Sequence, residues 1–489
     1  MNSSSRAKEE ILVADVVVIG GGGTGLAAAA AAAEKGARVV LLEKQGIGGN
    51  TAMATGLLAA DSLVQKSLNI VALPDDIVRK AVEFSHWSIN QRLFRAFVNK
   101  SADTIQWLED KGLTFQVLPT YPGQEPLTWH IADGRGAAVV KALRQACEDL
   151  GVQLFTQCPA KKIMTGGTGE ITGVVASRNG ADFQVNAKSV IIATGGYGGN
   201  KDLLRKYVPG YGENWQGYGL DLMGDGLVMA IELGAATEGL GNLMIHPLVY
   251  PGCKTFDWIL RDPRGLWVNK KGERFTDESV GLRPAECGNA VKGQPDACAY
   301  VIWDQDLLTT IANEGLGKHP LRGTQGLTSL RIYKGEITPE VLAKELQLEA
   351  EKGGIRISDS LGEIAEWMGV APESLNGTVR DYNAVSDRGY DEIFLKDRRF
   401  LRALRTPPYY AITSYVSFVT TLGGIKINHR MEVVNKQDDR IPGLYAGGDT
   451  TGGWESETYC IDLAGSAFGF AINSGRIAGE NAAENAQGR

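Results

Sequence analysis

The 489-residue sequence is poor in cysteine and contains no cysteine motif. Its six cysteines are scattered, and none belongs to a Cys-x-x-Cys or Cys-x-x-Cys-His pattern. Haem attachment of the c type and cysteine-rich zinc sites are therefore excluded, and no metal site is predicted. Scattered thiols of this kind are typical of a reducing compartment, where they pack as small hydrophobic groups. We therefore expect a cytoplasmic protein.

Long apolar runs and basic clusters are also missing. No stretch of about 18 apolar residues occurs, which excludes a membrane-spanning helix, and the polar N-terminus lacks the apolar core of a signal peptide. The formal charge is −7, with no basic patch, so a nucleic-acid partner is not expected. With 43% hydrophobic residues, the chain can form two or three globular domains.

A glycine-rich turn joins a strand to a helix near the N-terminus. The unit consists of strand 16–19, the turn Gly20-x-Gly22-x-x-Gly25, an alanine-rich helix, and strand 39–42 ending at Glu43. The first glycine makes a tight turn, the second lets the backbone approach a pyrophosphate, and the third lets the helix pack on the strand. Glu43 can accept ribose hydroxyls and would repel a 2′-phosphate, which disfavours NADP. The unit predicts a site for NAD or FAD.

A second small-residue loop favours FAD over NAD. Gly48-Gly49-Asn50-Thr51-Ala52 leads to Gly56 and has no role in binding NAD, whereas it suits a flat ring lying against backbone. Strand 189–192 runs into Ala193-Thr194-Gly195-Gly196, again typical of backbone that meets a ligand. Asp225 suits two roles, as a helix cap or as an acceptor for a ribose or ribityl hydroxyl.

The composition changes in the middle of the chain. Proline, tryptophan and charged residues become more frequent, and helices are expected at Pro339–Lys352 and Ser358–Trp367. A strand and ligand loop then return near Asp449, followed by a helix over Gly469–Ala483. We therefore predict three segments: residues 1–242 and 411–489 form one domain, and residues 243–410 form an inserted cap.

Eight segments, in order along nearly the whole chain, resemble the fumarate reductase/succinate dehydrogenase flavoprotein superfamily, which includes the 3-ketosteroid dehydrogenases. They are Gly20-x-Gly22-x-x-Gly25, Glu43, Gly48-Gly49-Asn50, Ala193-Thr194-Gly195-Gly196, Gly224-Asp225-Gly226, Gly272-Glu273-Arg274-Phe275-x-x-Glu278, Thr421-x-Gly423-Gly424 and Pro442-Gly443-Leu444-Tyr445-Ala446-Gly447-Gly448-Asp449. The resemblance implies an α/β fold: a Rossmann-like FAD-binding domain built from both chain ends, with an inserted α+β cap domain over the isoalloxazine. It also implies hydride transfer between flavin N5 and a carbon next to an activating group.

The resemblance implies which residues contact FAD. They are Gly20, Gly22, Gly23, Thr24, Gly25, Glu43, Lys44, Gly49, Asn50, Thr51, Gly56, Ala160, Ala193, Thr194, Gly195, Asp225, Gly448, Asp449 and Ser466. Members with covalent FAD carry a histidine near the glycine pair after the acidic residue. Residues 47–51 contain none, so we expect a non-covalent, dissociable FAD. Asp449 replaces the usual glutamate and can still accept a ribityl hydroxyl.

The substrate residues follow the fumarate reductases only in part. His246 resembles a histidine that contacts a substrate carboxylate, and Arg283 lies close to the position of a proton-donating arginine, with one extra intervening residue. The histidine after the Gly-Gly pair and the arginine of an Asn-Arg-x-Gly-Gly run are both absent from residues 454–466. A dicarboxylate needs cations at both ends and would lose half its clamp.

Gly465 and Tyr459 resemble a ketone clamp instead. Counted back from Arg476, Gly465 falls on the glycine whose N–H, with a tyrosine hydroxyl, holds the ketone in ketosteroid Δ1-dehydrogenases. Tyr459 can act as that tyrosine, although its spacing is two residues longer than in the family. Two donors on a carbonyl stabilise the enolate formed when the α-proton leaves. Tyr250 is our choice for the base; the alternatives are Tyr409, Tyr410 and Tyr415.

We therefore predict FAD-dependent α,β-dehydrogenation of a cyclic ketone, by α-proton abstraction and hydride transfer to flavin N5. The substrate is either a ketone that also carries a carboxylate, of the 4-oxocyclohexanecarboxylate type, or a 3-ketosteroid. The alternative is reduction of an α,β-unsaturated carboxylate with Arg283 as proton donor. An electron-transfer subunit docked to a membrane partner is a weaker hypothesis. The external electron acceptor stays open between oxygen, a quinone and a carrier. Glu455 and Glu457 are interpreted as solvated loop charges.

Overall fold

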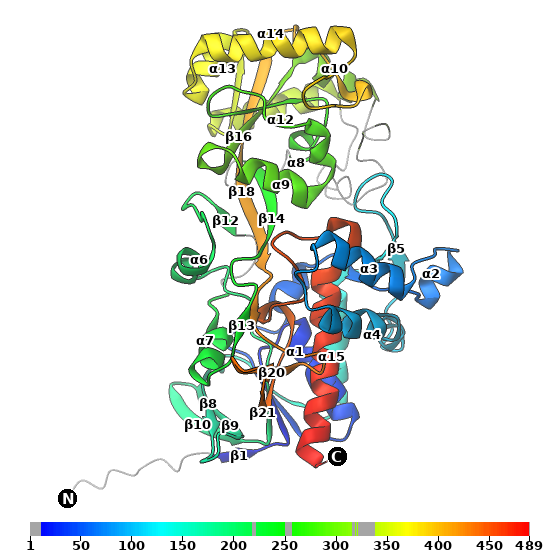
Figure 1. The fold of residues 1–489 in the computed structure, drawn as a ribbon, viewed down its shortest axis with the longest axis vertical. Coiled ribbons are helices and arrows are strands. Elements are labelled where there is room, and N and C mark those ends of the chain that lie inside the picture. The colour runs from blue at the N-terminus through cyan, green and yellow to red at the C-terminus, as the bar shows by residue number, and fades with distance from the viewer. Residues whose placement is uncertain are drawn as a thin grey trace, which may run out of the picture.

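A six-stranded sheet forms the lower part of the molecule in Figure 1. The computed structural model describes residues 11–217, 222–249, 257–314, 318, 320 and 338–488. The sheet contains, from edge to edge, β20 (Glu432–Val434), β21 (Arg440–Ala446), β11 (Ser189–Ile192), β2 (Val16–Ile19), β3 (Val39–Leu42) and β7 (Gln153–Phe155). All neighbours are parallel except β20 and β21. Every residue of β2, β3 and β11 is buried, which explains the Val, Ile and Leu runs that fill β2 and β3 and follow Ser189 in β11.

Two helices of small residues pack together beside this sheet. Helix α1 (Gly23–Glu34) follows β2, and α15 (Ser466–Gln487) runs from the middle of the molecule down toward its base, where the C-terminus lies (Figure 1). A Cβ atom at Gly475 would lie 2.3 Å from the Thr24 carbonyl oxygen, and one at Gly479 would lie 2.2 Å from that of Ala28. The helices therefore meet backbone to backbone, which only small side chains permit. The predicted Gly469–Ala483 helix is longer at both ends.

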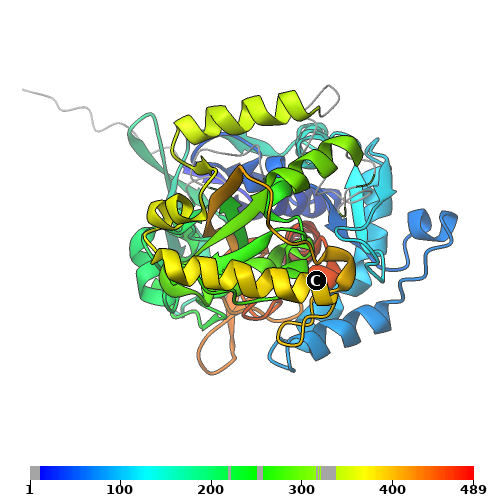
Figure 2. The ribbon, with the colours of Figure 1, turned by 90° about the horizontal axis from the view of Figure 1, so that it is seen from above.

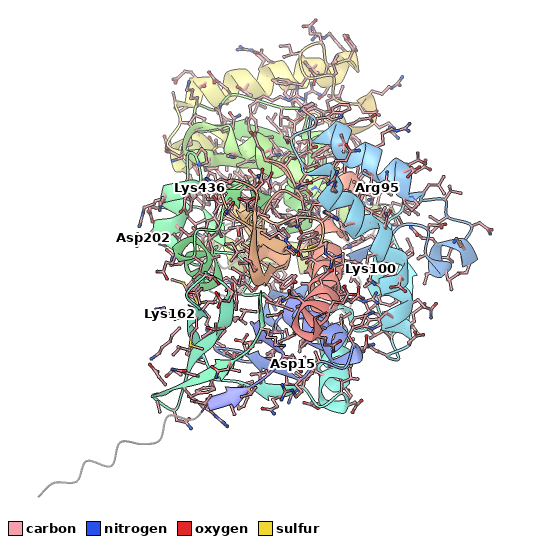
Figure 3. The ribbon with its side chains drawn as sticks, turned by 60° about the horizontal axis from the view of Figure 1, so that its bottom comes forward. Asp15, Arg95, Lys100, Lys162, Asp202 and Lys436 are labelled. Atoms are coloured by element: carbon pink, nitrogen blue, oxygen red, sulfur yellow. The ribbon has the colours of Figure 1, made fainter. Side chains whose placement is uncertain are left out.

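Smaller elements surround the main sheet. The strands are β1 (Ile11–Val13), β8 (Ala160–Thr165), β9 (Ile171–Arg178) and β10 (Ala181–Asn186) in one sheet, β4 (Leu57–Leu58), β5 (Phe115–Val117) and β6 (Trp129–Ala132) in another, and the pair β13 (Thr237–Glu238) and β19 (Gly424–Ile425). The helices are α2 (Leu63–Ser67), α3 (Pro74–Phe84), α4 (Gln91–Glu109), α5 (Arg135–Asp149), α6 (Lys201–Tyr207) and α7 (Asp225–Glu232). Figure 3 shows Lys100 of α4 beside α15, where it pairs with Glu480 at 2.9 Å.

The upper part is organised around one long strand, β18 (Tyr409–Thr421). It pairs with β12 (Gln216–Gly217), β14 (Leu243–Val249), β16 (Cys298–Asp304) and β17 (Ile355–Ser358), and β15 (Leu266–Asn269) extends the sheet beyond β16. The helices are α8 (Asp257–Leu260), α9 (Pro284–Lys292), α10 (Gln305–Glu314), α12 (Pro339–Glu351), α13 (Leu361–Met368) and α14 (Pro372–Arg388). Seen from above, the sheet lies between α12 and α14 (Figure 2). β18 descends from this sheet toward the lower part (Figure 1). The predicted division at residues 243 and 410 stays a prediction.

One cap helix begins later than its sequence suggests. A helix was expected from Ser358, but this residue ends β17, and α13 begins at Leu361. The alternating apolar residues Ile355 and Ile357 suit a strand beside β18. The Ser360 side chain then accepts a hydrogen bond from the Gly362 N–H and caps α13.

The cap contains a buried cluster of four charged side chains, which we call the cap charge cluster: Arg274, Glu278, Asp391 and Lys396. Arg274 donates to both carboxylate oxygens of Glu278, each at 2.8 Å, and pairs with Asp391 at 2.7 Å. Lys396 lies 3.1 Å from Glu278. Each charge thus has an opposite partner, so the Gly272-to-Glu278 motif anchors the cap internally.

Candidate active site

A cleft of about 940 Å³ opens beyond the carboxyl ends of β2, β3 and β11. Open α/β sheets bind ligands at this edge. The predicted FAD residues that line the cleft are Gly20, Gly22, Gly23, Thr24, Glu43, Lys44, Gly49, Asn50, Thr51, Ala160, Ala193, Thr194, Gly195, Asp225 and Asp449. One cleft therefore gathers residues that are spread over most of the sequence.

The three glycines of the first motif have different surroundings. Gly20 has a φ of 111°, and a Cβ atom there would lie 2.3 Å from the Ala193 carbonyl oxygen. At Gly22 the nearest atoms would be 3.9 Å away, so a side chain would project into space that the cleft needs. At Gly25 a Cβ atom would lie 1.8 Å from the Gly20 carbonyl oxygen. Gly25 thus fixes the helix against the turn and does not line the cleft.

The carboxylate of Glu43 is held at the end of β3 by two backbone donors. The Gly21 N–H donates to Oε2 at 2.7 Å, and the Gln45 N–H donates to Oε1 at 2.6 Å. Each oxygen has a second lone pair, so the carboxylate can still accept hydroxyl groups from a ribose in the cleft.

Two further charged residues meet at the cleft. Lys44 pairs with Asp225 at 2.7 Å, and both side chains line the cleft. The sequence allowed two roles for Asp225, as a helix cap or as an acceptor for a hydroxyl. Asp225 does not cap α7, because the N-cap residue is Gly224 and no side-chain hydrogen bond caps the helix.

Asp449 provides the sharpest evidence that the cleft is built for a polar ligand. Its Oδ2 accepts a hydrogen bond from the Thr420 hydroxyl at 2.7 Å, but Oδ1 is buried and has no partner among the described residues. Burial raises the pKa of this carboxyl to about 6. An unpaired buried oxygen is costly, so a donor from a ligand is expected there. A ribityl hydroxyl of FAD meets this need.

Three other predicted FAD residues lie outside the cleft lining. Gly56 packs against β6, where a Cβ atom would lie 2.7 Å from the His130 carbonyl oxygen. The Gly448 N–H donates to the Ser474 hydroxyl at 2.9 Å, and Ser466 is buried at the start of α15. Their contact with FAD stays a prediction.

Tyr459 and Gly465 come together at the N-terminus of α15. Burial raises the pKa of Tyr459 to about 12, although hydrogen bonds from Ser466 and from the backbone of Ala467 and Gly465 act to lower it. Gly465 caps the helix with a φ of 87°, and a Cβ atom there would lie 2.5 Å from the Leu58 nitrogen. Tyr459 and Gly465 are thus neighbours, but the Gly465 N–H is directed at the Tyr459 hydroxyl and neither residue lines the cleft. Their role toward a substrate ketone stays a prediction.

Glu455 is buried, so its interpretation as a solvated loop charge is wrong. Only 7% of the residue is exposed, whereas Glu457 is exposed as expected. The carboxylate accepts hydrogen bonds from Ser456 N at 3.1 Å, Cys460 N at 3.5 Å and the Ser466 hydroxyl at 3.4 Å. Burial raises the pKa of Glu455 to about 7. The loop folds onto α15, a tertiary contact that local polarity does not signal.

Arg283 lies between two carboxylates. It donates to Glu286 at 2.5 Å and to Asp462 at 2.9 Å, and its guanidinium lies 4.7 Å from the centre of the Tyr121 ring. Tyr121 donates to the same Asp462 carboxylate, and Lys80 lies 3.4 Å from it. Although burial works in the opposite direction, the Tyr121 hydrogen bond and the Arg283 charge hold the pKa of Asp462 below its usual value. Sequence reasoning found Arg283 but missed Tyr121, Asp462 and Lys80.

The remaining substrate residues are placed less completely. His246 lies on β14, and a Cβ atom at Gly288 of α9 would lie 3.1 Å from its backbone nitrogen. Arg283 directly precedes α9, so His246 and Arg283 lie on neighbouring elements. Tyr250 lies outside the described residues. Among the alternatives, Tyr410 stacks on Trp303 and donates to Gln305, as expected of a core aromatic residue.

The described residues form neither a metal site nor a membrane-spanning helix. In that part of the chain, no group of three or more His, Cys, Asp or Glu side chains is arranged to hold a metal ion. Nor does any helix there have both the length and the apolar character needed to cross a membrane.

Comparison with known proteins places this geometry in context. Residues 15–457 match a family described as FAD binding domain. The chain is 33% identical over 474 residues to the vinyl phenol reductase of Lactiplantibacillus plantarum, covering 92% of each. The open conformation of a flavocytochrome c3 fumarate reductase has a TM-score of 0.75 and 26% identity, covering 97% of this chain and 79% of that one.

A second solved structure shares the fold alone. The 3-ketosteroid-Δ4-(5α)-dehydrogenase from Rhodococcus jostii RHA1 has a TM-score of 0.75 at 22% identity, covering 98% of this chain and 99% of that chain. The chain therefore shares its fold with a 3-ketosteroid dehydrogenase as well as with a fumarate reductase.

Proposed function

Because the chain belongs to the FAD binding domain family, we propose that it reduces a carbon–carbon double bond conjugated to an uncharged oxygen function, such as a vinyl phenol or an unsaturated ketone. The chain is an FAD-dependent oxidoreductase that acts on carbon–carbon bonds, as predicted, and the predicted superfamily and α/β fold are confirmed. When bound, FAD supplies or accepts the hydride. The predicted non-covalent attachment and the individual FAD contacts remain proposals.

The observation that carries the proposal is the Tyr459 hydroxyl at the start of α15, together with the Gly465 backbone that supports it. As an unsaturated ketone accepts a hydride at its β-carbon, negative charge develops on the carbonyl oxygen. The Tyr459 hydroxyl, which accepts a hydrogen bond from the Gly465 backbone at the positive end of a helix, suits that oxygen as a donor. The alkene gains a hydride at one carbon and, in the final product, a proton at the other. An unsaturated ketone delocalises this charge directly onto its carbonyl oxygen. A vinyl phenol does so when its terminal carbon takes the proton first, because the resulting quinone methide becomes a phenolate as it accepts the hydride.

The charge balance around Arg283 favours an uncharged substrate. Glu286 and Asp462 already neutralise the guanidinium, so a substrate carboxylate would have to displace one of them. Although burial opposes it, the charges of Glu286 and Asp462 raise the pKa of Arg283 above its usual value. A good general acid has a pKa near the working pH, so this arginine is a weak choice as proton donor. Reduction of an unsaturated carboxylate is therefore the less supported alternative.

The second candidate is the reverse reaction, desaturation of a cyclic ketone. The Tyr459 and Gly465 pair supports it equally, because the same enolate forms in both directions. A 3-ketosteroid fits this version better than a 4-oxocyclohexanecarboxylate-like substrate, since Arg283 is already paired. Its base would be Tyr250, as the sequence suggested. An oxygen, quinone or carrier acceptor is then required, whereas the reductive direction requires an electron donor.

Anaerobic mixing tests these directions. The FAD-loaded protein, reduced with one equivalent of dithionite, is mixed with 4-vinylphenol, cyclohex-2-enone, acrylate or fumarate while flavin absorbance is followed. We expect the two uncharged substrates to reoxidise the flavin and fumarate to act no faster than buffer. Fastest reoxidation by fumarate would overturn the proposal. Bleaching of the oxidised protein by a saturated ketosteroid, without reoxidation by any alkene, would establish the second candidate instead.

The Tyr459→Phe variant tests the oxygen-binding role directly. Loss of one donor to the developing charge should slow flavin reoxidation by cyclohex-2-enone by roughly 10²- to 10³-fold, with FAD content unchanged. Tyr390→Phe, at an exposed tyrosine, is the matched control and should react like the wild type. Equal rates in the two variants would show that the Tyr459 hydroxyl does not stabilise the substrate oxygen, and the proposal would be wrong.

Asp462→Asn tests the exclusion of carboxylates. The substitution leaves Arg283 with Glu286 alone, so the rate with fumarate relative to cyclohex-2-enone should rise severalfold. Asp61→Asn, which removes an exposed partner of Lys66, controls for a general loss of negative charge. An unchanged substrate ratio would show that Arg283 does not face the substrate.

A further inference from the structure

We propose that Glu455 is the internal proton reservoir of this site, exchanging a proton with Tyr459 through the hydroxyl of Ser466. The inference deepens the proposed function, because it assigns the source of the proton that accompanies the hydride. Glu455 is a positioning residue in this scheme, since it reaches the substrate only through two other side chains.

The geometry forms a continuous path of exchangeable protons. The Ser466 hydroxyl lies 3.4 Å from Glu455 Oε2 and also hydrogen-bonds to the Tyr459 hydroxyl. A serine hydroxyl donates one hydrogen bond while it accepts another, so it can pass a proton between its two neighbours. Glu455, Ser466 and Tyr459 are 7%, 0% and 3% exposed, respectively, so bulk water does not reach these groups.

The electrostatic surroundings suit a group that gains and loses a proton near neutrality. Hydrogen bonds from Ser456, Cys460 and Ser466 only partly offset the burial of Glu455, and in the described part of the chain no cation contributes. Its charge in turn helps to raise the pKa of Tyr459, and that of the Cys460 thiol above its usual range.

The other charged groups that face this loop are acidic or already paired. Glu238 packs against Gly453, where a Cβ atom would lie 2.4 Å from its Oε2, and Asp462 and Glu286 also act on Cys460. The latter two hold Arg283. The pKa values of Tyr121 and Tyr459 are both raised to about 12. Glu455, whose pKa is about 7, is therefore the best matched proton donor in this part of the site.

The proton steps balance for an unsaturated ketone. As hydride reaches the β-carbon, Tyr459 gives its proton to the ketone oxygen, Ser466 gives one to Tyr459, and Glu455 gives one to Ser466. At Tyr459 and at Ser466 one O–H bond breaks and one forms, the ketone oxygen gains an O–H bond, and Glu455 loses its O–H bond and is left ionised. The enol product becomes the saturated ketone by tautomerisation, with no net change in protons. When the product leaves, water enters the space that it occupied and gives a proton to Tyr459, and the same path returns a proton through Ser466 to Glu455. Desaturation runs these steps backwards.

Glu455→Gln, with Glu457→Gln as the matched control, tests the scheme. In single turnovers with cyclohex-2-enone, the wild-type rate should fall as pH rises through about 7, because ionised Glu455 has no proton to give. Glu455→Gln should be roughly 10²-fold slower and lose this inflection, while exposed Glu457→Gln keeps both. Persistence of the wild-type inflection in Glu455→Gln would overturn the proposal.

Two further measurements keep the test independent of folding and of substrate. Ser466→Ala leaves the carboxyl in place but interrupts the path, so it should reproduce the rate loss; wild-type kinetics would refute the relay. Infrared difference spectra of the FAD-loaded protein between pH 5 and 9 should show one protonated carboxyl that titrates near pH 7 and is absent in Glu455→Gln. This band does not depend on turnover. If no alkene reoxidises the flavin but the infrared band is present, the proposed function is wrong and the assignment of Glu455 stands. If the band is absent, Glu455 is not the proton reservoir.

Discussion

The cap charge cluster and the residues around the cleft and α15 are both buried, but they treat charge in opposite ways. In the cap, Arg274, Glu278, Asp391 and Lys396 provide two cations and two carboxylates, each close to an opposite charge. Asp449 and Glu455 are buried carboxylates to which no described cation contributes. Charge that holds a fold together is neutralised internally, whereas charge left uncompensated points to a ligand or a moving proton.

The difference also separates stability from function. A buried ion pair contributes little net stability compared with apolar residues, but removing one partner leaves an uncompensated charge behind. Asp449 and Glu455 avoid that cost by shifting their pKa values toward neutrality, so they can be neutral when no ligand is bound.

Breaking the cap charge cluster should produce the largest effect on stability. Glu278→Gln leaves Lys396 facing a neutral amide and Arg274 with Asp391 alone, so we expect unfolding to be easier by about 3–5 kcal/mol. The midpoint of urea unfolding measures this change. Glu213→Gln, at an exposed partner of Arg205, should leave the unfolding midpoint nearly unchanged, because solvent screens that pair. Equal shifts would show that the cluster is not under electrostatic constraint.

The FAD cleft could be predicted from the sequence because its signals are local. The glycines at 20, 22 and 25, with the acid at Glu43, lie within one strand–helix–strand unit whose geometry follows from residue size. The buried strands read as apolar runs, and the final helix was found with its ends misplaced. Backbone rules that act over a few residues were sufficient for these features.

The substrate side could be predicted only in part because its contacts are long-range. Arg283 meets Asp462 across 179 positions, and Asp462 meets Tyr121 across 341. No local pattern connects such residues. Glu455 resembles a loop charge because burial of its loop depends on α15 packing above it. The cap motif was recognised at Arg274 and Glu278, but its partners Asp391 and Lys396 lie over a hundred residues away.

Asp449→Asn should have the next largest effect, on FAD affinity. Loss of a charged acceptor for a ribityl hydroxyl should weaken binding by about 1.5–3 kcal/mol. In the wild type, a hydroxyl donor favours the ionised carboxylate, so binding releases a proton and strengthens as pH rises toward and through about 6. The variant should lose this dependence. Quenching of FAD fluorescence between pH 5 and 8 measures both effects, and a wild-type pH profile in the variant would exclude Asp449 from FAD binding.

Asp225→Asn should have the smallest effect, and it sharpens the comparison within one cleft. Asp225 is paired with Lys44 at 2.7 Å, and their side chains are 47% and 32% exposed, respectively. Exposed pairs contribute about 0–1 kcal/mol, so FAD affinity should change by at most about fivefold. Because salt screens exposed charges, the change should shrink when ionic strength is raised from about 0.05 to about 0.5 M, whereas the effect of Asp449→Asn should persist. If Asp225→Asn weakened FAD binding as much as Asp449→Asn at both salt concentrations, compensation of charge would not distinguish the two carboxylates.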